Sequence, residues 1–170
     1  MSKIFFDRPT LDVARDLLGK YLVRRFEDGE VRALMINEVE AYDGPDDKAS
    51  HASRGMTARN KTMFGPAGFW YVYFVYGMHW MLNMVTGPKD YPAAVLIRGA
   101  GGHNGPAKLT KALKIDGKIN GLEAIPKNDL WIEDRGIEVK KSHILSLPRV
   151  GVSYAGSIWS IKKYRFRFSD

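Results

Sequence analysis

The sequence predicts a single α+β domain, built as a curved antiparallel β-sheet with flanking helices and a protruding aromatic β-hairpin. Segments with strand character outnumber segments with helical spacing along the chain. The dipeptide Asp28-Gly29 lies between two of these segments, and it is a typical turn of an antiparallel hairpin. The chain has 170 residues and is 45% hydrophobic, which is enough for one sizeable core, so we expect residues 1–170 to form one domain.

The N-terminal segment is expected to contribute one helix and the first two strands. Apolar residues repeat at helical spacing over residues 11–18, with Thr10 as the expected cap and Gly19 as the stop. Residues 21–26 and 31–42 have the composition of strands. We expect these two strands to pair through the intervening turn.

The middle of the chain changes character twice. Residues 43–67 contain two Gly-Pro pairs and no sustained period, so we expect a long irregular segment, which inside a compact domain is usually functional. Residues 69–76 are the most β-prone stretch, Gly77 offers a break, and residues 80–85 are the expected partner strand. Residues 93–98 form another apolar strand that ends in a charge.

The C-terminal part is expected to begin with a second helix. Pro106 suits the first helical position, and residues 107–115 continue with helical spacing. Residues 116–127 are expected to form a polar connection. Further short strands are expected at residues 130–133, 136–139 and 164–168.

The charge balance favours a polyanionic partner. Lys and Arg total 26 against 19 for Asp and Glu, which gives a formal net charge of +7. Such a surplus is typical of nucleic-acid-binding proteins, although charge alone is equally compatible with a basic protein that has no such partner. The chain has no cysteine, which excludes disulfides and thiolate-ligated zinc.

The location of the protein is predicted from two features of the sequence. The N-terminus reaches Asp7 and Arg8 before any apolar stretch of useful length, which is not typical of a signal peptide. No run approaches the roughly 20 apolar residues that a membrane span needs. We therefore expect an intracellular protein without membrane association, in the cytoplasm or nucleoid of a prokaryote or in the nucleus of a eukaryote.

Two glutamates in the second strand are the first candidate for chemistry. If residues 31–42 form a regular strand, Glu38, Glu40 and Tyr42 share one face with Leu34 and Ile36. Carboxylates beside an apolar face are costly unless they are paired or used. Carboxylates two residues apart, with Cα atoms roughly 7 Å apart, can act as acid and base in sugar hydrolysis, so the pair alone also fits a glycoside hydrolase or an ion-paired strand end.

The wider pattern resembles the alkyladenine (3-methyladenine) DNA glycosylase family. The matches run in order from Phe5 to near the C-terminus, and their order makes the resemblance specific. They comprise Glu38–Tyr42, Gly44–Asp47 and His51, then Arg59-Asn60 and Met63-Phe64, then Tyr71–Met78 and Asn83, then Ala94–Arg98, Gly105–Leu109 and Arg149–Val152. The resemblance implies a compact single-domain fold with a basic, concave face for DNA.

The resemblance implies three catalytic groups. Glu40 resembles the general base that deprotonates the attacking water. Arg98 and the backbone carbonyl of Val150 resemble the groups that hold this water. No nucleophilic lysine occurs in the matched motifs, so we expect a monofunctional enzyme without AP lyase activity, and Glu38 is left with a structural role that the sequence does not specify.

The resemblance also implies a pocket for the flipped base. Tyr42 and Tyr73 correspond to its aromatic walls, and His51 to a third side. Ala49 falls where the family reads the purine edge with a backbone carbonyl. Asn83 corresponds to the residue that rejects guanine by crowding its exocyclic amine.

The aromatic hairpin is expected to insert into DNA through its tip. Tyr76 resembles the wedge that fills the gap left by the flipped base, and Met78 is expected to intercalate beside it. Residues Trp70 and Phe74 lie on the same face of the strand as Tyr76, and we assign both to the core. Candidates for phosphate contact are Arg54, Arg59, Lys61, Lys108, Lys111 and Lys114.

The predicted function is that of a base excision repair glycosylase for alkylated or otherwise damaged purines. Double-stranded DNA that carries such bases is the expected partner, and we expect the protein to act as a monomer without cofactor or metal. The expected substrate is 3-methyladenine, and 7-methylguanine, hypoxanthine and ethenoadenine are further candidates. A carbohydrate-active hydrolase that uses the Glu38 and Glu40 pair, or a non-catalytic DNA-binding module, remains the alternative.

Overall fold

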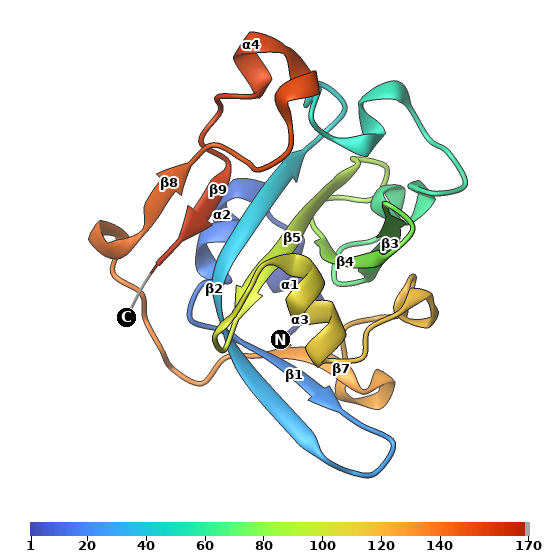
Figure 1. Cartoon of the computed structure of the whole chain (residues 1–170), viewed down its shortest axis with the longest axis vertical. Coiled ribbons are helices and arrows are strands. Elements are labelled where there is room, and N and C mark those ends of the chain that lie inside the picture. The colour runs from blue at the N-terminus through green and yellow to red at the C-terminus, as the bar shows by residue number, and fades with distance from the viewer. Residues whose placement is uncertain (169–170) are drawn as a thin grey trace.

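The strands pair into one curved antiparallel sheet of nine strands, in a computed structural model that describes residues 1–168 (Figure 1). The main path of the sheet runs in the order β3-β4-β5-β2-β1-β7. Strand β6 pairs with β5, and β9 lies between β2 and β8. The strands are β1 (Tyr21–Arg25), β2 (Val31–Asp43), β3 (Trp70–Val75), β4 (His79–Val85), β5 (Ala93–Ala100), β6 (His103–Asn104), β7 (Leu130–Glu133), β8 (Leu145–Leu147) and β9 (Arg165–Arg167). A single domain with a curved antiparallel sheet is thus confirmed.

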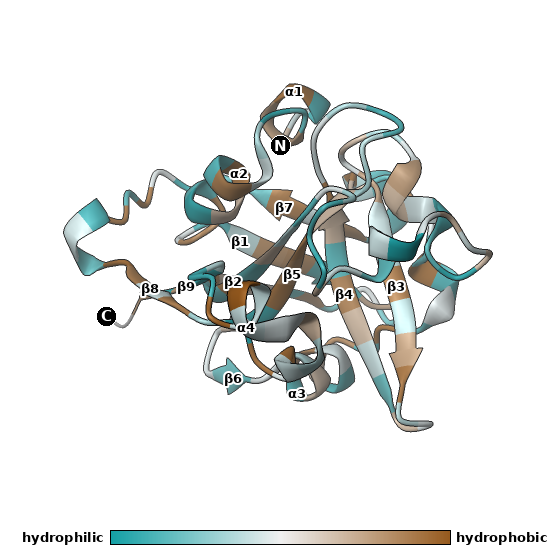
Figure 2. Ribbon diagram, turned by 90° about the horizontal axis from the view of Figure 1, so that it is seen from above, coloured by the Kyte–Doolittle hydropathy of each residue, from teal (hydrophilic) through white to brown (hydrophobic). Residues whose placement is uncertain are grey.

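The helices are short and lie on either side of the strands. In Figure 2, α1 and α2 lie at one edge of the view, α3 and α4 lie toward the opposite edge, and the sheet passes between them. The turn that joins β3 to β4 lies at the margin of the same view. The α-helices are α1 (Lys3–Phe6), α2 (Thr10–Asp16), α3 (Pro106–Ala112) and α4 (Gly156–Trp159). No helix in the described part of the chain is long and apolar enough to cross a membrane.

Six single-turn 3₁₀ helices fill the connections between these elements within residues 1–168. Two of them, η1 and η2, lie in the segment that we expected to be irregular, so that segment has local order without a long period. The 3₁₀ helices are η1 (His51–Arg54), η2 (Lys61–Phe64), η3 (Gly117–Ile119), η4 (Pro126–Asn128), η5 (Lys141–His143) and η6 (Ser153–Ala155).

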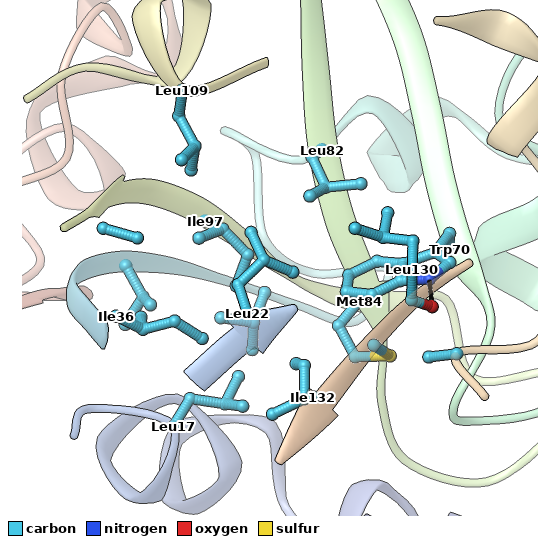
Figure 3. Packing of buried hydrophobic residues seen from close by; sticks show 14 of the residues in the cluster. Leu17, Leu22, Ile36, Trp70, Leu82, Met84, Ile97, Leu109, Leu130 and Ile132 are labelled. Atoms are coloured by element: carbon cyan, nitrogen blue, oxygen red, sulfur yellow. Dashed lines mark hydrogen bonds between the residues drawn. The ribbon is translucent and has the colours of Figure 1, made fainter. Parts of the chain in front are cut away.

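One large hydrophobic cluster joins both groups of helices to the sheet (Figure 3). Leu17, next to α2, and Leu109 of α3 lie at opposite ends of the view, with Ile97 of β5 between them. Trp70 is fully buried, and its indole N–H donates a hydrogen bond to the carbonyl oxygen of Leu130 at 3.0 Å. Each such apolar side chain contributes about 1.5–3 kcal/mol on burial, so this cluster supplies the rigid base on which the site is built.

Helix α2 begins one residue earlier than expected. Thr10 is its first residue, and the preceding Pro9 makes no side-chain cap, so the predicted Thr10 cap is wrong. The physical reason is that the Thr10 hydroxyl is buried, where it accepts a hydrogen bond from the Thr86 hydroxyl at 3.2 Å. The helix also ends earlier than expected, at Asp16 with Leu17 as its C-cap, and Gly19, with a φ of +82° that favours glycine, lies in the turn that follows.

Strand β2 does not keep one face along its length. Ile36, Val39 and Ala41 all belong to the hydrophobic core, although Ile36 and Val39 are an odd number of residues apart. The register between β2 and β5 shifts twice between Ile36 and Val39, which is the irregularity of a β-bulge. The expected shared face of Ile36, Glu38 and Glu40 is therefore wrong, because the irregularity turns the two glutamates away from the core that holds Ile36.

Two further expectations are corrected. Phe74 is 42% exposed, not a core residue, and it packs instead on its cross-strand partner Trp80 with ring centroids 4.6 Å apart. Residues 136–139 form no strand, because this segment packs over Gly19 and Val139 contacts the main core without pairing. The short strand β8, which we did not predict, pairs with β9.

Candidate functional site

Glu40 is the centre of the site, and its carboxylate is completely buried. The Tyr42 hydroxyl donates a hydrogen bond to Oε2 of Glu40 at 2.9 Å. The backbone N–H of Val150 donates to Oε1 at 2.8 Å, and the Arg98 guanidinium lies 3.4 Å from the same oxygen. Both carboxylate oxygens are therefore held in fixed directions by three different parts of the chain.

Burial and hydrogen bonding act on Glu40 in opposite directions. Burial raises the pKa of Glu40, whereas the charge of Arg98, the Val150 amide and the Tyr42 hydroxyl each lower it, in that order, and the net result is a raised pKa. Burial, followed by the charge of Glu40, raises the pKa of Tyr42 well above its usual value. Tyr42 thus keeps its proton and remains a hydrogen-bond donor to the carboxylate.

Glu38 has a defined place in this network, which the sequence left open. It is 8% exposed and accepts hydrogen bonds from Arg98 at 3.1 Å and from Arg165 at 3.0 Å. Arg98 is thus held between the two glutamates. Since the Glu38 carboxylate is bound by two guanidinium groups, Glu38 and Glu40 do not present the two free carboxylates that a glycoside hydrolase requires.

A cavity of about 340 Å³ opens beside Glu40. This volume falls in the range of small-molecule sites. Its walls are formed by β2, the β3–β4 pair, β5, and the segments that follow β2 and β8. All eight residues predicted for the catalytic groups and the base pocket line it, namely Glu40, Tyr42, Ala49, His51, Tyr73, Asn83, Arg98 and Val150.

Aromatic rings pack closely on one side of the cavity. The His51 and Tyr73 rings meet edge to face with centroids 4.7 Å apart, and Tyr71 lies 5.1 Å from Tyr73. His51 Nδ1 lies 3.4 Å from the Tyr71 hydroxyl. Burial, followed by the charge of Arg59, lowers the pKa of His51, so the imidazole is neutral near neutral pH.

Asn83 is held at the cavity wall by the backbone of the hairpin strands. Its side-chain amide donates to the carbonyl oxygens of Tyr71 at 3.1 Å and Met81 at 3.4 Å. The side chain is 2% exposed, so its position is rigid. A rigid side chain at the wall of a cavity limits the outline of a bound ligand.

The backbone of Ala49 is fixed at both ends. Its N–H donates to Asp47 at 3.1 Å, and its carbonyl oxygen accepts a hydrogen bond from the Tyr154 hydroxyl at 2.8 Å. Tyr154 also lines the cavity, although two-thirds of the residue is exposed at 66%. The carbonyl that we expected to read a base is thus satisfied by a residue at the cavity rim.

The turn between β3 and β4 exposes two apolar side chains. Tyr76 is 85% exposed and Met78 is 65% exposed. Tyr76 has a φ of +53° and Gly77 a φ of +65°, as a tight turn requires. Tyr76 also lines the cavity, so the turn stands next to its mouth.

The predicted phosphate contacts divide into two groups. Arg59 donates to the Phe74 carbonyl at 2.8 Å and its guanidinium lies 5.2 Å from the centre of the Tyr73 ring, so it braces the hairpin. All six candidates, Arg59 included, are exposed, and Lys108 and Lys111 lie on α3 while Lys114 follows it. The exposed remainder comprises Arg54, Lys61, Lys108, Lys111 and Lys114.

Sequence reasoning missed the residues that connect distant segments. Asp47 and Arg149 form a buried ion pair across 102 residues of sequence. Tyr154 reaches Ala49 across 105 residues. Asp47 and Arg149 both lie in matched motifs, Gly44–Asp47 and Arg149–Val152, but no pattern of spacing pointed from one to the other or from Tyr154 to Ala49.

Comparison with known proteins identifies what the chain is similar to. A profile of the methylpurine-DNA glycosylase (MPG) family matches residues 4–102 and 101–170. A protein of Methanocella arvoryzae, provisionally named 3-methyladenine DNA glycosylase, is 48% identical over 98% of this chain and 90% of its own length. A protein of Streptomyces avermitilis with the same provisional name is 42% identical over 93% of this chain and 84% of its own length. A protein of Legionella pneumophila with that name is 42% identical over 100% of this chain and 94% of its own length.

Proposed function

This chain belongs to the methylpurine-DNA glycosylase family, and on that premise we propose that it is a monofunctional glycosylase of base excision repair that removes 3-methyladenine from duplex DNA. It hydrolyses the N-glycosyl bond between the damaged purine and deoxyribose. The observation that carries the mechanism is the buried carboxylate of Glu40, held by Tyr42, Arg98 and the Val150 amide beside a cavity of base size.

Glu40 acts as the general base in this proposal. A water molecule gives a proton to the Glu40 carboxylate while the water oxygen forms a bond to the anomeric carbon of the sugar. The N-glycosyl bond breaks, and its electron pair leaves with the purine, which departs as a neutral base when the lesion is cationic. The carboxylate also stabilises the positive charge that develops on the sugar, and Arg98 and the backbone of Val150 orient the water.

The cavity is the pocket for the flipped base. Tyr42 and Tyr73 stack on the two faces of the flipped base. Such stacking contributes roughly 1–3 kcal/mol per base, which offsets part of the cost of removing the base from the stack of the duplex. His51 packs along a third side, and the Ala49 carbonyl reads the purine edge with its second lone pair, since the first accepts the Tyr154 hydroxyl. Asn83 excludes guanine by crowding its exocyclic amine, and its rigid hydrogen bonds support this role.

The β3–β4 pair is the protruding aromatic hairpin of the proposal, and its tip enters the duplex. Tyr76 fills the gap left by the flipped base, with Met78 beside it. Their exposure supports this role, since large apolar side chains are exposed at a cost unless they meet a partner. The exposed basic residues Arg54, Arg59, Lys61, Lys108 and Lys111 contact phosphates, and the protein acts as a monomer on the DNA.

The decisive experiment measures base release from duplexes that each carry one defined lesion. The parent protein is expected to release 3-methyladenine, and comparison with 7-methylguanine, hypoxanthine and ethenoadenine gives its range. Glu40→Gln is expected to lower the single-turnover rate by about 100-fold or more while DNA affinity is kept. Tight binding by the parent without any free base would identify a non-catalytic DNA-binding module, and a Glu40→Gln rate equal to the parent would refute the mechanism.

A further inference from the structure

Asp47 and Arg149 form an ion pair with no exposed side-chain surface on either partner. Arg149 Nη2 donates to Oδ1 of Asp47 at 2.8 Å, and Nη1 donates both to Oδ2 of the same carboxylate and to the Ala41 carbonyl at 2.8 Å. Such a buried pair is weak evidence for stability, because desolvation offsets much of its attraction. Its position in the molecule points to another role.

The pair fastens the two segments that complete the cavity. On one side, the carboxylate of Asp47 also accepts the backbone N–H groups of Asp43 and Ala49, both at 3.1 Å, so it shapes the segment that leads to the cavity wall. On the other side, Arg149 is followed directly by Val150, whose N–H reaches Glu40 at 2.8 Å. The ion pair between these two segments therefore sets the distance from the Val150 amide to the Glu40 carboxylate.

Arg149 also supports the Tyr42 wall from outside the cavity. Its guanidinium carbon lies 4.8 Å from the centre of the Tyr42 ring and 5.2 Å from that of Tyr164. Arg149 is not among the residues that line the cavity, whereas Tyr42 is. The planar guanidinium thus fills the space behind a ring whose hydroxyl is bonded to Glu40, and a flexible ammonium group cannot replace this stacking.

We propose that Asp47 and Arg149 are positioning residues for base removal: their ion pair holds the Val150 amide and the Tyr42 ring in place on Glu40. Neither touches the reacting atoms, and the inference rests on the proposed role of Glu40 as the general base. A loosened pair lengthens the hydrogen bonds to the carboxylate. Because those bonds favour the charged form, the pKa of Glu40 then rises further.

The charged and titratable groups that act on Glu40 determine which variants are informative. They are Arg98 on β5, Arg165 on β9, Tyr42 on β2, Tyr73 on β3 and Tyr154 on η6, together with the Val150 amide. Arg149 itself lies close enough to feel the charge of Glu40. Removal of Asp47 alone would leave an unpaired cation near Glu40 and would mask the effect, so variants must preserve the local net charge.

Two variants of the full chain meet this condition. Arg149→Lys keeps the charge but loses the fork of hydrogen bonds and the stacking on Tyr42. The double variant Asp47→Asn with Arg149→Gln removes both charges together. Arg25→Lys is the matched control, because Arg25 and Asp129 form an exposed Arg–Asp pair of 3.2 Å that has no contact with the cavity.

Carboxyl ¹³C NMR follows the titration of Glu40 directly. The Glu40 signal is assigned as the one that is missing from the spectrum of Glu40→Gln, and this readout does not depend on activity. We expect the Glu40 midpoint to rise by about one pH unit in both variants, with melting temperature as the check on folding. The acid limb of the single-turnover rate against pH should shift upward by the same amount, and the maximal rate should fall about tenfold or more. Arg25→Lys should leave the titration and the rates unchanged.

The outcomes separate this inference from the proposed function. Folded variants that titrate Glu40 at the parental pH overturn the positioning role, and so does failure of both variants to fold, which would assign the pair to stability alone. If the variants show the shifted Glu40 titration but the parent protein releases no base, the positioning role is upheld and the glycosylase mechanism is rejected.

Discussion

Glu40 illustrates at the scale of a single residue how a functional group opposes stability. The carboxylate is completely buried, and burial outweighs the four interactions that favour its charged form. A raised pKa in the folded state means that the folded protein binds a proton more readily than the unfolded chain does. The ionised group therefore destabilises the fold at neutral pH, and this cost is absent below the pKa of the unfolded chain.

We expect Glu40→Gln to be at least as stable as the parent near pH 7, since glutamine keeps the shape and removes the buried charge. The advantage should shrink as the pH falls through the raised pKa of Glu40 and vanish below about pH 4, near the pKa of an unfolded glutamate. Thermal unfolding from pH 7 to pH 3 measures the difference. The expectation is contradicted if the stability of Glu40→Gln relative to the parent is lower at pH 7 than at pH 4.

At the scale of elements, strand β2 and the β3–β4 hairpin place the chemistry. The register shifts between Ile36 and Val39 turn Glu38 and Glu40 away from the core, while Val39 and Ala41 anchor the same strand in it. Gly99 lies opposite this irregularity, where a Cβ atom would stand 2.6 Å from Oδ1 of Asn37. The hairpin is anchored in the core by Trp70 of β3 and Leu82 of β4, and its exposed turn brings Tyr76 to the cavity mouth.

The exposure of the hairpin tip predicts a separation of stability from activity. Tyr76→Ala should change the free energy of unfolding by less than about 0.5 kcal/mol, because the side chain is 85% exposed. Base release from duplex DNA should fall about tenfold or more, since nothing fills the gap left by the flipped base. Release from a single-stranded lesion should change little, because no duplex gap forms.

The other hairpin of the molecule offers the control. Val31 is 52% exposed beside the turn between β1 and β2, and it does not line the cavity. Val31→Ala should leave both rates unchanged. Equal losses for duplex and single-stranded lesions in Tyr76→Ala would count against a wedge and in favour of a pocket residue.

At the scale of the whole molecule, we expect charge to govern how the protein finds DNA. The net charge is +7, and α3 carries Lys108 and Lys111 exposed, while Pro106 at its start lines the cavity. Contacts with phosphates contribute affinity without sequence preference and release counterions. The proposed search along undamaged DNA therefore depends on exposed cations, separately from the cavity that recognises damage.

Affinity for undamaged duplex should fall steeply with salt, and each lost phosphate contact should reduce the slope of log K against log salt by about 0.9. We expect Lys108→Ala with Lys111→Ala to lower the slope by up to about 1.8, with the single-turnover rate on saturated DNA unchanged. Fluorescence anisotropy over a salt series measures the slope. Lys141→Ala, at a separate cavity beside α2, is the control, and an equal change there would argue for a general effect of charge.

The sequence by itself determined the features that depend on nearby residues. Strand-forming composition and turn residues predicted the β1–β2 hairpin through Gly29 and the β3–β4 pair through Gly77, because strand pairing across a short turn is a local event. The order of motifs predicted the family and named eight residues that line one cavity. The roles expected of those residues followed from the same resemblance.

Only the tertiary structure decided what depends on distant segments. The face of Glu40 was mispredicted, because a β-bulge is set by pairing with β5 and not by the alternation within β2. Phe74 was assigned to the core because it shares a strand face with Trp70. Alternation gives the face of a residue but does not say how far along the strand the core covers that face, and Phe74 lies beyond it. The bond from Val150 to Glu40 and the pair of Asp47 with Arg149 join residues more than 100 positions apart, and such contacts exist only once the core has brought β2 and the C-terminal segment together.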